Sequence, residues 1–318
     1  MKNIFLFGEC MIELMTVSQE KSSTHMKQSF AGDVFNTAVY LKRTFNDINV
    51  NLVSAVGQDK FSLDMIQYFK NESIGTDFVF QSGTKIPGLY AIQLDEVGER
   101  SFIYWRENSA ARQVMQHIND NVVKTLSQGD MFFFSGISLA VVAPDARPSF
   151  WSMVEKLKIA GVNIVFDPNY RARMWESKAQ AKTQFEQAFT HADVLLPGVD
   201  DFEQLYGLST SQAVYDFCKP YQFNELIIKN GEAGICCYIN DQAYQFSITP
   251  IDSVVDTTSA GDSFNGVYLG ARVKGYSLEH AIDLASKSAA FVIQHYGAIV
   301  ESEIHQQFIK EQLSLVNK

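Results

Sequence analysis

The sequence predicts an α/β protein with a central, mostly parallel sheet flanked by helices. From Met131 onward, short apolar runs that suit strands buried on both faces alternate with helical segments. Paired extended stretches with polar turns come earlier and predict a second, smaller sheet. We therefore expect one domain over residues 1–318, with a lid built from about 10–31 and 87–106.

Length and composition narrow the function. The 318 residues are 46% hydrophobic, enough for one elaborated α/β domain or two small ones. The net charge of −10 argues against nucleic acid, because no face rich in Lys and Arg can replace counterions. No apolar run approaches the roughly 18 residues of a membrane span, and the start of the chain is too short an apolar stretch for a signal peptide. We expect a cytoplasmic protein that acts on a small molecule and does not bind membranes.

The individual elements follow from apolar runs and their polar ends. The run at 3–7 predicts the first strand of the main sheet, and 50–55 predicts another. The small sheet is expected from strands at 11–17, 26–30, 89–94 and 100–105. Later strands are expected at 131–135, 163–167, 194–197, 225–229 and 235–239, with helices at 144–158, 178–189, 200–206, 261–274 and 278–294.

The stretch from Asp256 to Gly266 joins an extended segment to an apolar helix. Its small residues Ser259, Ala260 and Gly261 leave backbone N–H groups uncovered at a helix start, where an anion is favoured. Asp262 follows directly and could take a proton from a substrate hydroxyl. Alternatively, Asp262 only satisfies loose amides at the helix start.

This stretch carries a family resemblance. Asp-Thr-Thr-Ser-Ala-Gly-Asp-Ser-Phe resembles the C-terminal signature of the ribokinase-like (PfkB) carbohydrate kinases, Asp-Thr-x-Gly-Ala-Gly-Asp-x-Phe, with Ser259 where glycine is common. The resemblance spans nearly the whole chain. It implies a ribokinase-like fold, ATP and Mg²⁺ as cofactors, Asp262 as general base, and amides of Ala260 and Gly261 as the anion hole. We expect the amides from Ser259 to Asp262 to hold the transferring phosphoryl group.

A second motif lies near the start of the chain. The stretch from Ala31 to Ala38 resembles the family's Gly-Gly-x-x-x-Asn-x-Ala, with Ala31 in place of the first glycine. By this resemblance Gly32 lets a sugar approach the backbone, while Asp33 and Asn36 bind its hydroxyls. Taken alone, Asp33 would be an ordinary helix cap.

Further candidates follow later strands, where a doubly wound sheet places its ligands. Ile137 follows the strand at 131–135. The segment from Asp167 to Arg171 resembles the family's Asp-x-Asn-x-Arg, which implies that Asn169 and Arg171 lie near phosphate and substrate oxygens. As an alternative, Arg171 is a plain surface charge.

The nucleotide loop is expected from Lys229 to Gly234. The resemblance implies that Lys229, Gly231 and Gly234 border ATP, although such a turn alone is more often a simple hairpin. Many relatives hold Mg²⁺ with Asn-x-x-Glu. Here the matching positions are Gly198 and Asp201, so Asp201 could act through water and the direct metal ligands stay open.

The expected substrate is a sugar acid. Arg106 ends a strand of the small sheet, and a guanidinium can hold a carboxylate in bidentate fashion. The segments that contain Arg106, Tyr90, Tyr104 and Arg171 resemble the corresponding segments of family members that phosphorylate 2-keto-3-deoxygluconate. The resemblance implies transfer to the 6-hydroxyl of that sugar acid. Arg106 could instead only pair with Glu107 or Glu99 at the edge of the lid.

Several alternatives stay open at this point. A kinase of a neutral sugar such as fructose or ribose would need no carboxylate partner for Arg106. The sequence does not separate 2-keto-3-deoxygluconate from its C4 epimer, 2-keto-3-deoxygalactonate, as the substrate. A sugar-binding regulator without catalysis is a third reading. Alternating apolar residues of the lid suit a homo-oligomer that pairs through it.

Overall fold

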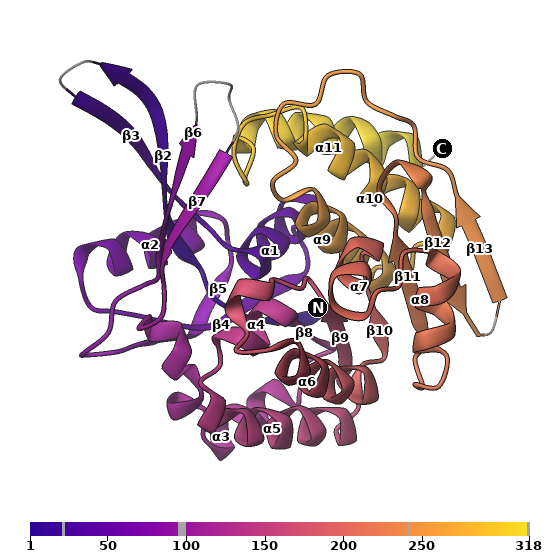
Figure 1. Cartoon of the computed structure of the whole chain (residues 1–318), viewed down its shortest axis with the longest axis horizontal. Helices are drawn as coiled ribbons and strands as arrows, with labels where there is room; N and C mark the ends of the chain where they lie inside the picture. The colour runs from indigo at the N-terminus through magenta and orange to yellow at the C-terminus, as the bar shows by residue number, and fades with distance from the viewer. Residues whose placement is uncertain (21–22, 95–99, 241, 317–318) are drawn as a thin grey trace.

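The computed structural model describes residues 1–20, 23–94, 100–240 and 242–316, and Figure 1 shows its arrangement. Nine strands form one large sheet in the order β13-β12-β11-β10-β9-β8-β1-β4-β5. All neighbours are parallel except β11 with β12 and β12 with β13. The strands are β1 (Asn3–Phe7), β4 (Asn49–Val56), β5 (Gly75–Gln81), β8 (Met131–Ser135), β9 (Asn163–Asp167), β10 (Val194–Leu195), β11 (Glu225–Lys229), β12 (Ile235–Ile239) and β13 (Gln242–Phe246).

Helices cover both faces of this sheet, so its central strands are apolar throughout. Side chains alternate along β1, and Ile4 and Leu6 therefore enter one core while Phe5 and Phe7 enter the other. The first core is closed by α1 (Asp33–Thr44), α2 (Lys60–Asn71), α9 (Ala260–Val273), α10 (Leu278–Val292) and α11 (Ser302–Val316). The second is closed by α3 (Asp120–Leu126), α4 (Gly136–Val141), α5 (Arg147–Ile159), α6 (Lys178–His191), α7 (Val199–Tyr206) and α8 (Ser211–Cys218).

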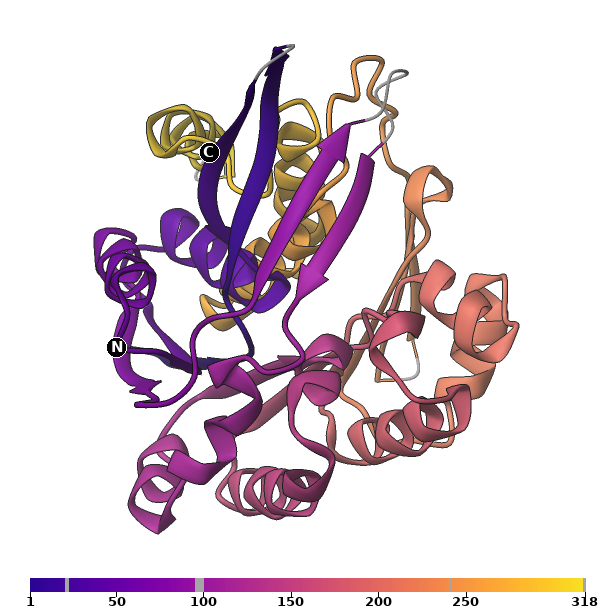
Figure 2. The ribbon, with the colours of Figure 1, turned by 60° about the vertical axis from the view of Figure 1, so that its left-hand side comes forward.

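The small sheet stands apart from the large one, as Figure 2 shows. It contains β2 (Met11–Glu20), β3 (Ser23–Ala31), β6 (Leu89–Leu94) and β7 (Arg100–Trp105) in the order β3-β2-β6-β7. Only the central pair, β2 with β6, is parallel. The structure therefore confirms the prediction that strands from the first third of the chain form a second, smaller sheet.

The expected boundaries were correct for most buried strands and less accurate elsewhere. β2 and β3 are longer than the predicted 11–17 and 26–30, because polar residues of the expected turn continue the antiparallel pairing. The loop expected at 95–99 lies outside the described residues. β10 ends at Leu195, short of the predicted 194–197, since Pro197 has no N–H for a ladder. The edge strands β5 and β13 were not predicted.

Close packing of α1 against α9 depends on a glycine. A Cβ at Gly266 would lie 2.4 Å from the Thr37 carbonyl oxygen and 2.9 Å from the Leu41 nitrogen. Because both are backbone atoms, the two helices can approach this closely only without a side chain there. The contact sets the start of α1 beside the start of α9.

Helix α11 covers α1 through a fully buried histidine. The His305 ring packs 5.1 Å from the Tyr40 ring, and neither ring nitrogen has a hydrogen-bond partner among the residues described. Burial, helped by Arg43, lowers the pKa of His305 to about 3. The folded protein therefore keeps this ring neutral.

No helix in the described part of the chain is both long and apolar enough to cross a membrane.

His305 makes stability depend on pH. Its pKa is about 3 when folded and ~6.5 when unfolded, so the unfolded chain takes up a proton below ~6.5 that the folded chain refuses. Stability is therefore lost as pH falls through that range, by about 2 kcal/mol from this residue at pH 5. Urea unfolding at pH 7 and pH 5 measures the loss. His305→Phe should lose less, and an equal loss in both proteins would contradict this assignment.

Candidate active site

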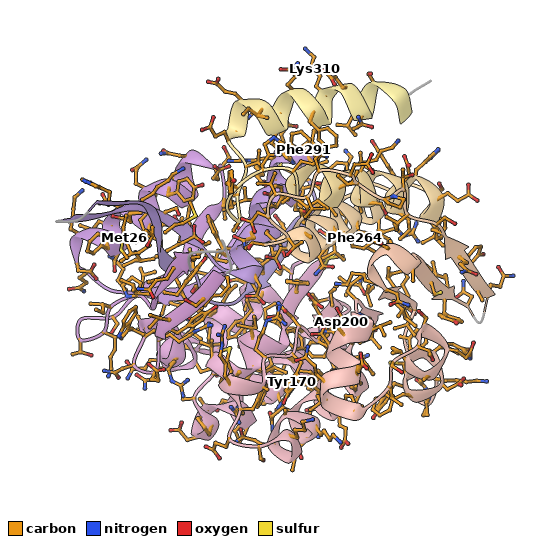
Figure 3. The ribbon with its side chains drawn as sticks, turned by 45° about the horizontal axis from the view of Figure 1, so that its top comes forward. Met26, Tyr170, Asp200, Phe264, Phe291 and Lys310 are labelled. Atoms are coloured by element: carbon orange, nitrogen blue, oxygen red, sulfur yellow. The ribbon has the colours of Figure 1, made fainter. Side chains whose placement is uncertain are left out.

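Several candidate residues and their partners lie at the carboxyl ends of the parallel strands. Ser135 and Asp167 end β8 and β9 as direct register partners, and Lys229 ends β11. Asp262 lies in the first turn of α9. Figure 3 labels one residue on each of three segments that contribute to the site. These are Tyr170 after β9, Asp200 on α7 and Phe264 on α9, and each is next in sequence to a residue of the site. Open α/β sheets bind their ligands at this edge.

Asp262 is a half-buried carboxylate held by α1. The Asn36 amide Nδ2 donates to Asp262 Oδ2 at 2.9 Å. Burial and the nearby Asp33 carboxylate raise the pKa of Asp262 to about 7, although the Asn36 hydrogen bond acts in the opposite direction. A carboxylate with this pKa is well suited to take up and release a proton near neutral pH.

The loop before Asp262 exposes backbone N–H groups. Ser259 has φ 66°, in the left-handed region that glycine adopts without steric cost, which explains why glycine is common there. The Ala260 amide donates to the Thr257 carbonyl at 3.3 Å, so it is already engaged. Among the described residues the Gly261 and Asp262 amides have no protein acceptor, and a Cβ at Gly261 would meet nothing within 4 Å. An anion can therefore reach these two amides.

Asp33 is tied to the ends of two strands. Its Oδ2 accepts from Ser135 Oγ at 2.5 Å and from Asn169 Nδ2 at 3.0 Å. Burial raises the pKa of Asp33, while the Ser135 hydrogen bond and the Arg106 charge lower it. Asp33 begins α1 without capping it by its side chain, which leaves this carboxylate to the site.

Lys229 belongs to a buried polar network. Its Nζ donates to Asn265 Oδ1 at 3.0 Å and lies 3.5 Å from Asp167 Oδ1. Asn265 Nδ2 in turn donates to Asp167 Oδ2 at 2.8 Å. Asn265 is three residues after Asp262, so both lie on one face of α9. The network therefore fixes the ammonium of Lys229 relative to Asp262.

The expected nucleotide loop connects β11 to β12. Gly231 and Gly234 have φ of 49° and 100°, and the Asn230 amide donates to the Gly234 carbonyl at 3.0 Å. A Cβ at Gly234 would lie 2.4 Å from the Phe246 carbonyl oxygen, whereas one at Gly231 would meet nothing within 4 Å. Gly234 thus serves the turn itself, and Gly231 is the glycine that faces open space.

Asp201 and Arg171 lie beside the segment after β9. Asp201 Oδ1 accepts from the Tyr170 amide at 2.8 Å and lies 3.7 Å from Arg171 Nη1. Burial and the Asp167 charge raise the pKa of Asp201 to about 6, against the pull of Arg171. Arg171 is about half exposed. In the described residues no three His, Cys, Asp or Glu side chains form a metal-binding group.

Arg106 is paired with a residue that the sequence did not suggest. Its Nε donates to Glu9 Oε2 at 2.8 Å and its Nη2 donates to the same oxygen. The considered partner Glu107 accepts only from the Arg106 backbone amide, and Glu99 lies outside the described residues. Pairing of the guanidinium with Glu107 at the lid edge is therefore wrong, because the guanidinium binds Glu9, two residues after the end of β1.

The other small-sheet candidates are also held in place. Tyr90 donates its hydroxyl proton to Glu13, which also accepts from Ser29 Oγ at 2.7 Å. The rings of Tyr90 and Tyr104 stack with centroids 5.5 Å apart. The guanidinium of Arg173 lies 3.8 Å from the centre of the Tyr104 ring. Tyr90 can therefore offer a ligand only its oxygen lone pairs.

Two remaining predictions concern backbone positions. A Cβ at Gly32 would lie 2.3 Å from the Glu9 carbonyl oxygen, so glycine is needed there whether or not a sugar approaches. The Gly32 amide also donates to Asn36 Oδ1 at 3.3 Å. Ile137 is half-buried in the first turn of α4, directly after Ser135 and Gly136.

Sequence reasoning missed four residues of this region, Glu9, Glu13, Asp167 and Asn265. Glu9 and Asp167 follow or end a buried strand, which is the same signal that selected the other candidates. Asn265 could have been found from its helical spacing to Asp262. Glu13 gave no such signal, since it lies within β2 and its partner Tyr90 comes from β6.

Comparisons with known proteins place the chain in a family. The family model described as pfkB family carbohydrate kinase matches residues 1–305. A 2-dehydro-3-deoxygluconokinase of Haemophilus influenzae is 39% identical over 95% of this chain and 96% of its own. Another 2-dehydro-3-deoxygluconokinase, from Dickeya dadantii, is 34% identical over 95% and 98% of the two chains.

Solved structures agree on the fold. The structure of a fructokinase with bound ATP from Xylella fastidiosa superposes with a TM-score of 0.80 and covers 98% of this chain and 99% of its own. At 20% identity this likeness concerns the fold alone. From the family match and the full-length relatives it follows that the chain belongs to the pfkB family of carbohydrate kinases, with their ribokinase-like fold.

Proposed function

We propose that this protein is an ATP-dependent kinase that phosphorylates the 6-hydroxyl of 2-dehydro-3-deoxy-D-gluconate. The observation that carries the proposal is Asp262, a half-buried carboxylate whose pKa is raised to about 7, beside two open amides. The full-length 2-dehydro-3-deoxygluconokinases that resemble this chain support the choice of substrate.

In this proposal Asp262 takes the proton of the 6-hydroxyl as the hydroxyl oxygen attacks the γ-phosphorus of ATP, while the bond from that phosphorus to the β–γ bridging oxygen breaks and ADP leaves. Asn36 holds the carboxylate so that its other oxygen, Oδ1, can point to the hydroxyl. The amides of Gly261 and Asp262, at the positive end of α9, stabilise the charge on the transferring phosphoryl group. Base and anion site then share one helical turn, which keeps donor and acceptor in line.

The nucleotide would lie between the signature loop and the loop after β11. Lys229 offers a fixed ammonium to phosphate oxygens, and Gly231 leaves room for the nucleotide. Asn169 and Arg171 complete the phosphate end. When bound, Mg²⁺ would neutralise phosphate charge, held by phosphate oxygens and water with Asp201 as an outer partner.

The small sheet, residues 10–31 and 87–106 of a single kinase domain, would act as the lid over the sugar. Asp33 and Asn36 face the hydroxyls, Tyr90 accepts from one of them, and the free Nη1 edge of Arg106 binds the carboxylate. A closed lid excludes water, so ATP is not hydrolysed unproductively.

A homo-oligomer formed through the lid is part of the proposal. On the edge strand β7, Phe102, Ile103 and Trp105 are exposed in the chain alone, and a second copy could cover them.

The base role of Asp262 predicts a specific loss. Asp262→Asn keeps the shape and the amides but removes the proton acceptor, so turnover should fall on the order of 10²- to 10⁴-fold with sugar binding retained. In the unmodified enzyme kcat/KM should fall about tenfold per pH unit below ~7, because only the ionised carboxylate accepts a proton. Coupled kinetics from pH 5 to 9 measure both. Near-normal turnover of Asp262→Asn would eliminate this base.

The nucleotide loop can be tested at its open glycine. Gly231→Val should raise KM for ATP on the order of tenfold, because a branched side chain enters the space given to the nucleotide, and should leave KM for the sugar nearly unchanged. Gly161→Val is the matched control, since Gly161 has a similar positive φ and equally open surroundings at the other end of the sheet. A change confined to the sugar KM would assign the loop to the wrong substrate.

The substrate class is tested through Arg106. Arg106→Ala should lower kcat/KM for the sugar acid more than tenfold. Removing one partner of a buried pair of charges costs ~2–5 kcal/mol of binding free energy, because the substrate carboxylate is left unpaired. Arg106→Lys should recover part of the loss, because an ammonium lacks the planar fork. A neutral analogue without the carboxylate should be a poor substrate and should respond little to either change. Equal losses on acid and neutral sugar would favour a neutral-sugar kinase.

A further inference from the structure

The four chain crossings between the two sheets meet at Glu9. The first crossing contains Glu9 itself, between β1 and β2. The second passes at Gly32, where a Cβ would lie 2.3 Å from the Glu9 carbonyl oxygen. The third passes at Gly88, where a Cβ would lie 2.7 Å from Glu9 Oε1, and the fourth begins at Arg106, which pairs with Glu9 Oε2. Glu9 therefore contacts every connection of the small sheet to the large one.

The burial of Glu9 is costly unless it serves a purpose. Its side chain is 1% exposed, and Oε1 has no hydrogen-bond partner among the residues described. Both donors of Arg106 converge on Oε2, so the pair does not use the two parallel bonds that a guanidinium and a carboxylate can make. Burying a carboxylate with one oxygen that has no hydrogen-bond partner costs desolvation free energy, so this arrangement does not stabilise the fold by itself.

The geometry of the pair leaves one edge of Arg106 available. Nε and Nη2 are occupied by Glu9, while Nη1 has only the weak acceptor Met174 Sδ at 3.6 Å. The side chain of Arg106 is 11% exposed, so it cannot swing freely. Its charge also lowers the pKa of Asp33, one of the residues proposed to bind the sugar, against the larger effect of burial.

From these contacts we infer that Glu9 is a positioning residue for the sugar-acid site. It holds Arg106 by two of its nitrogens so that the Nη1 edge faces the substrate carboxylate, and it anchors this contact where the chain crosses between the two sheets. Gly88 is the space that allows it, because any side chain there would displace Glu9 Oε1 or Arg106. The inference rests on the proposed function and adds a specificity-determining residue to it.

The test separates binding from turnover. Glu9→Gln keeps the shape and removes the charge that orients Arg106, so KM for the sugar acid should rise more than about tenfold while kcat stays within about threefold. Glu107→Gln is the matched control, because it removes a nearby charge that touches only the Arg106 backbone. It should change KM less than about twofold. In an Arg106→Lys background, Glu9→Gln should add little further loss, since both act on one contact.

Each contrary outcome overturns the inference. Glu9→Gln behaving like Glu107→Gln would show that Glu9 does not act on the substrate contact. A fall in KM would show that Glu9 competes with the substrate for Arg106. If Glu9→Gln does not fold, Gly88→Ala decides, because it keeps every charge and should reproduce the rise in KM. An unchanged KM in Gly88→Ala would refute the role. An unmodified enzyme inactive on the sugar acid would instead refute the proposed function.

Discussion

Repulsion among four aspartates is the constraint on which the site depends. Asp33, Asp167, Asp201 and Asp262 come from separate elements and meet at one edge of the sheet. Burial is the largest cause that raises the pKa of Asp33, Asp201 and Asp262, and the charge of Asp167 raises each of them further. Such a cluster of carboxylates is tolerated only where hydrogen-bond donors and cations surround it. The cations are Lys229, Arg171 and Arg106, and the donors are the side-chain amides of Asn36, Asn169 and Asn265. Burial and, after it, repulsion from Asp33 and Asp167 raise the pKa of Asp262 to about 7.

The two sheets are coupled through the same charges. The charge of Arg106, which follows β7 of the small sheet, lowers the pKa of Asp33 on α1, and Glu9 binds Arg106 where the chain crosses between the sheets. Tyr90 is fixed by Glu13 in a similar way. Buried acids of the first 13 residues thus orient side chains that arrive about 80 to 100 positions later. Tyr90 and Arg106 are therefore held in place by acids near the start of the chain.

The sequence by itself determined the fold class and the motif-bearing loops. Strands such as β8, β9 and β11 were predicted with correct boundaries because parallel strands covered on both faces are apolar throughout, a pattern readable in five residues. The edge strands β5 and β13 were missed, because exposed edges carry polar residues. Asp262 and its loop were found because a long motif of small residues is local in sequence.

Only the tertiary structure decided which partners the candidate residues have. Nothing near Arg106 in sequence points to Glu9, 97 positions away, and the local candidates Glu107 and Glu99 were the wrong choice or lay outside the described residues. The Ala260 amide proved to be engaged in its own turn, and Gly32 serves the Glu9 carbonyl. Hydrogen bonds and ion pairs depend on atoms within about 4 Å. Which side chains come that close is set by strand order and helix packing, which the residue pattern of any one segment does not contain.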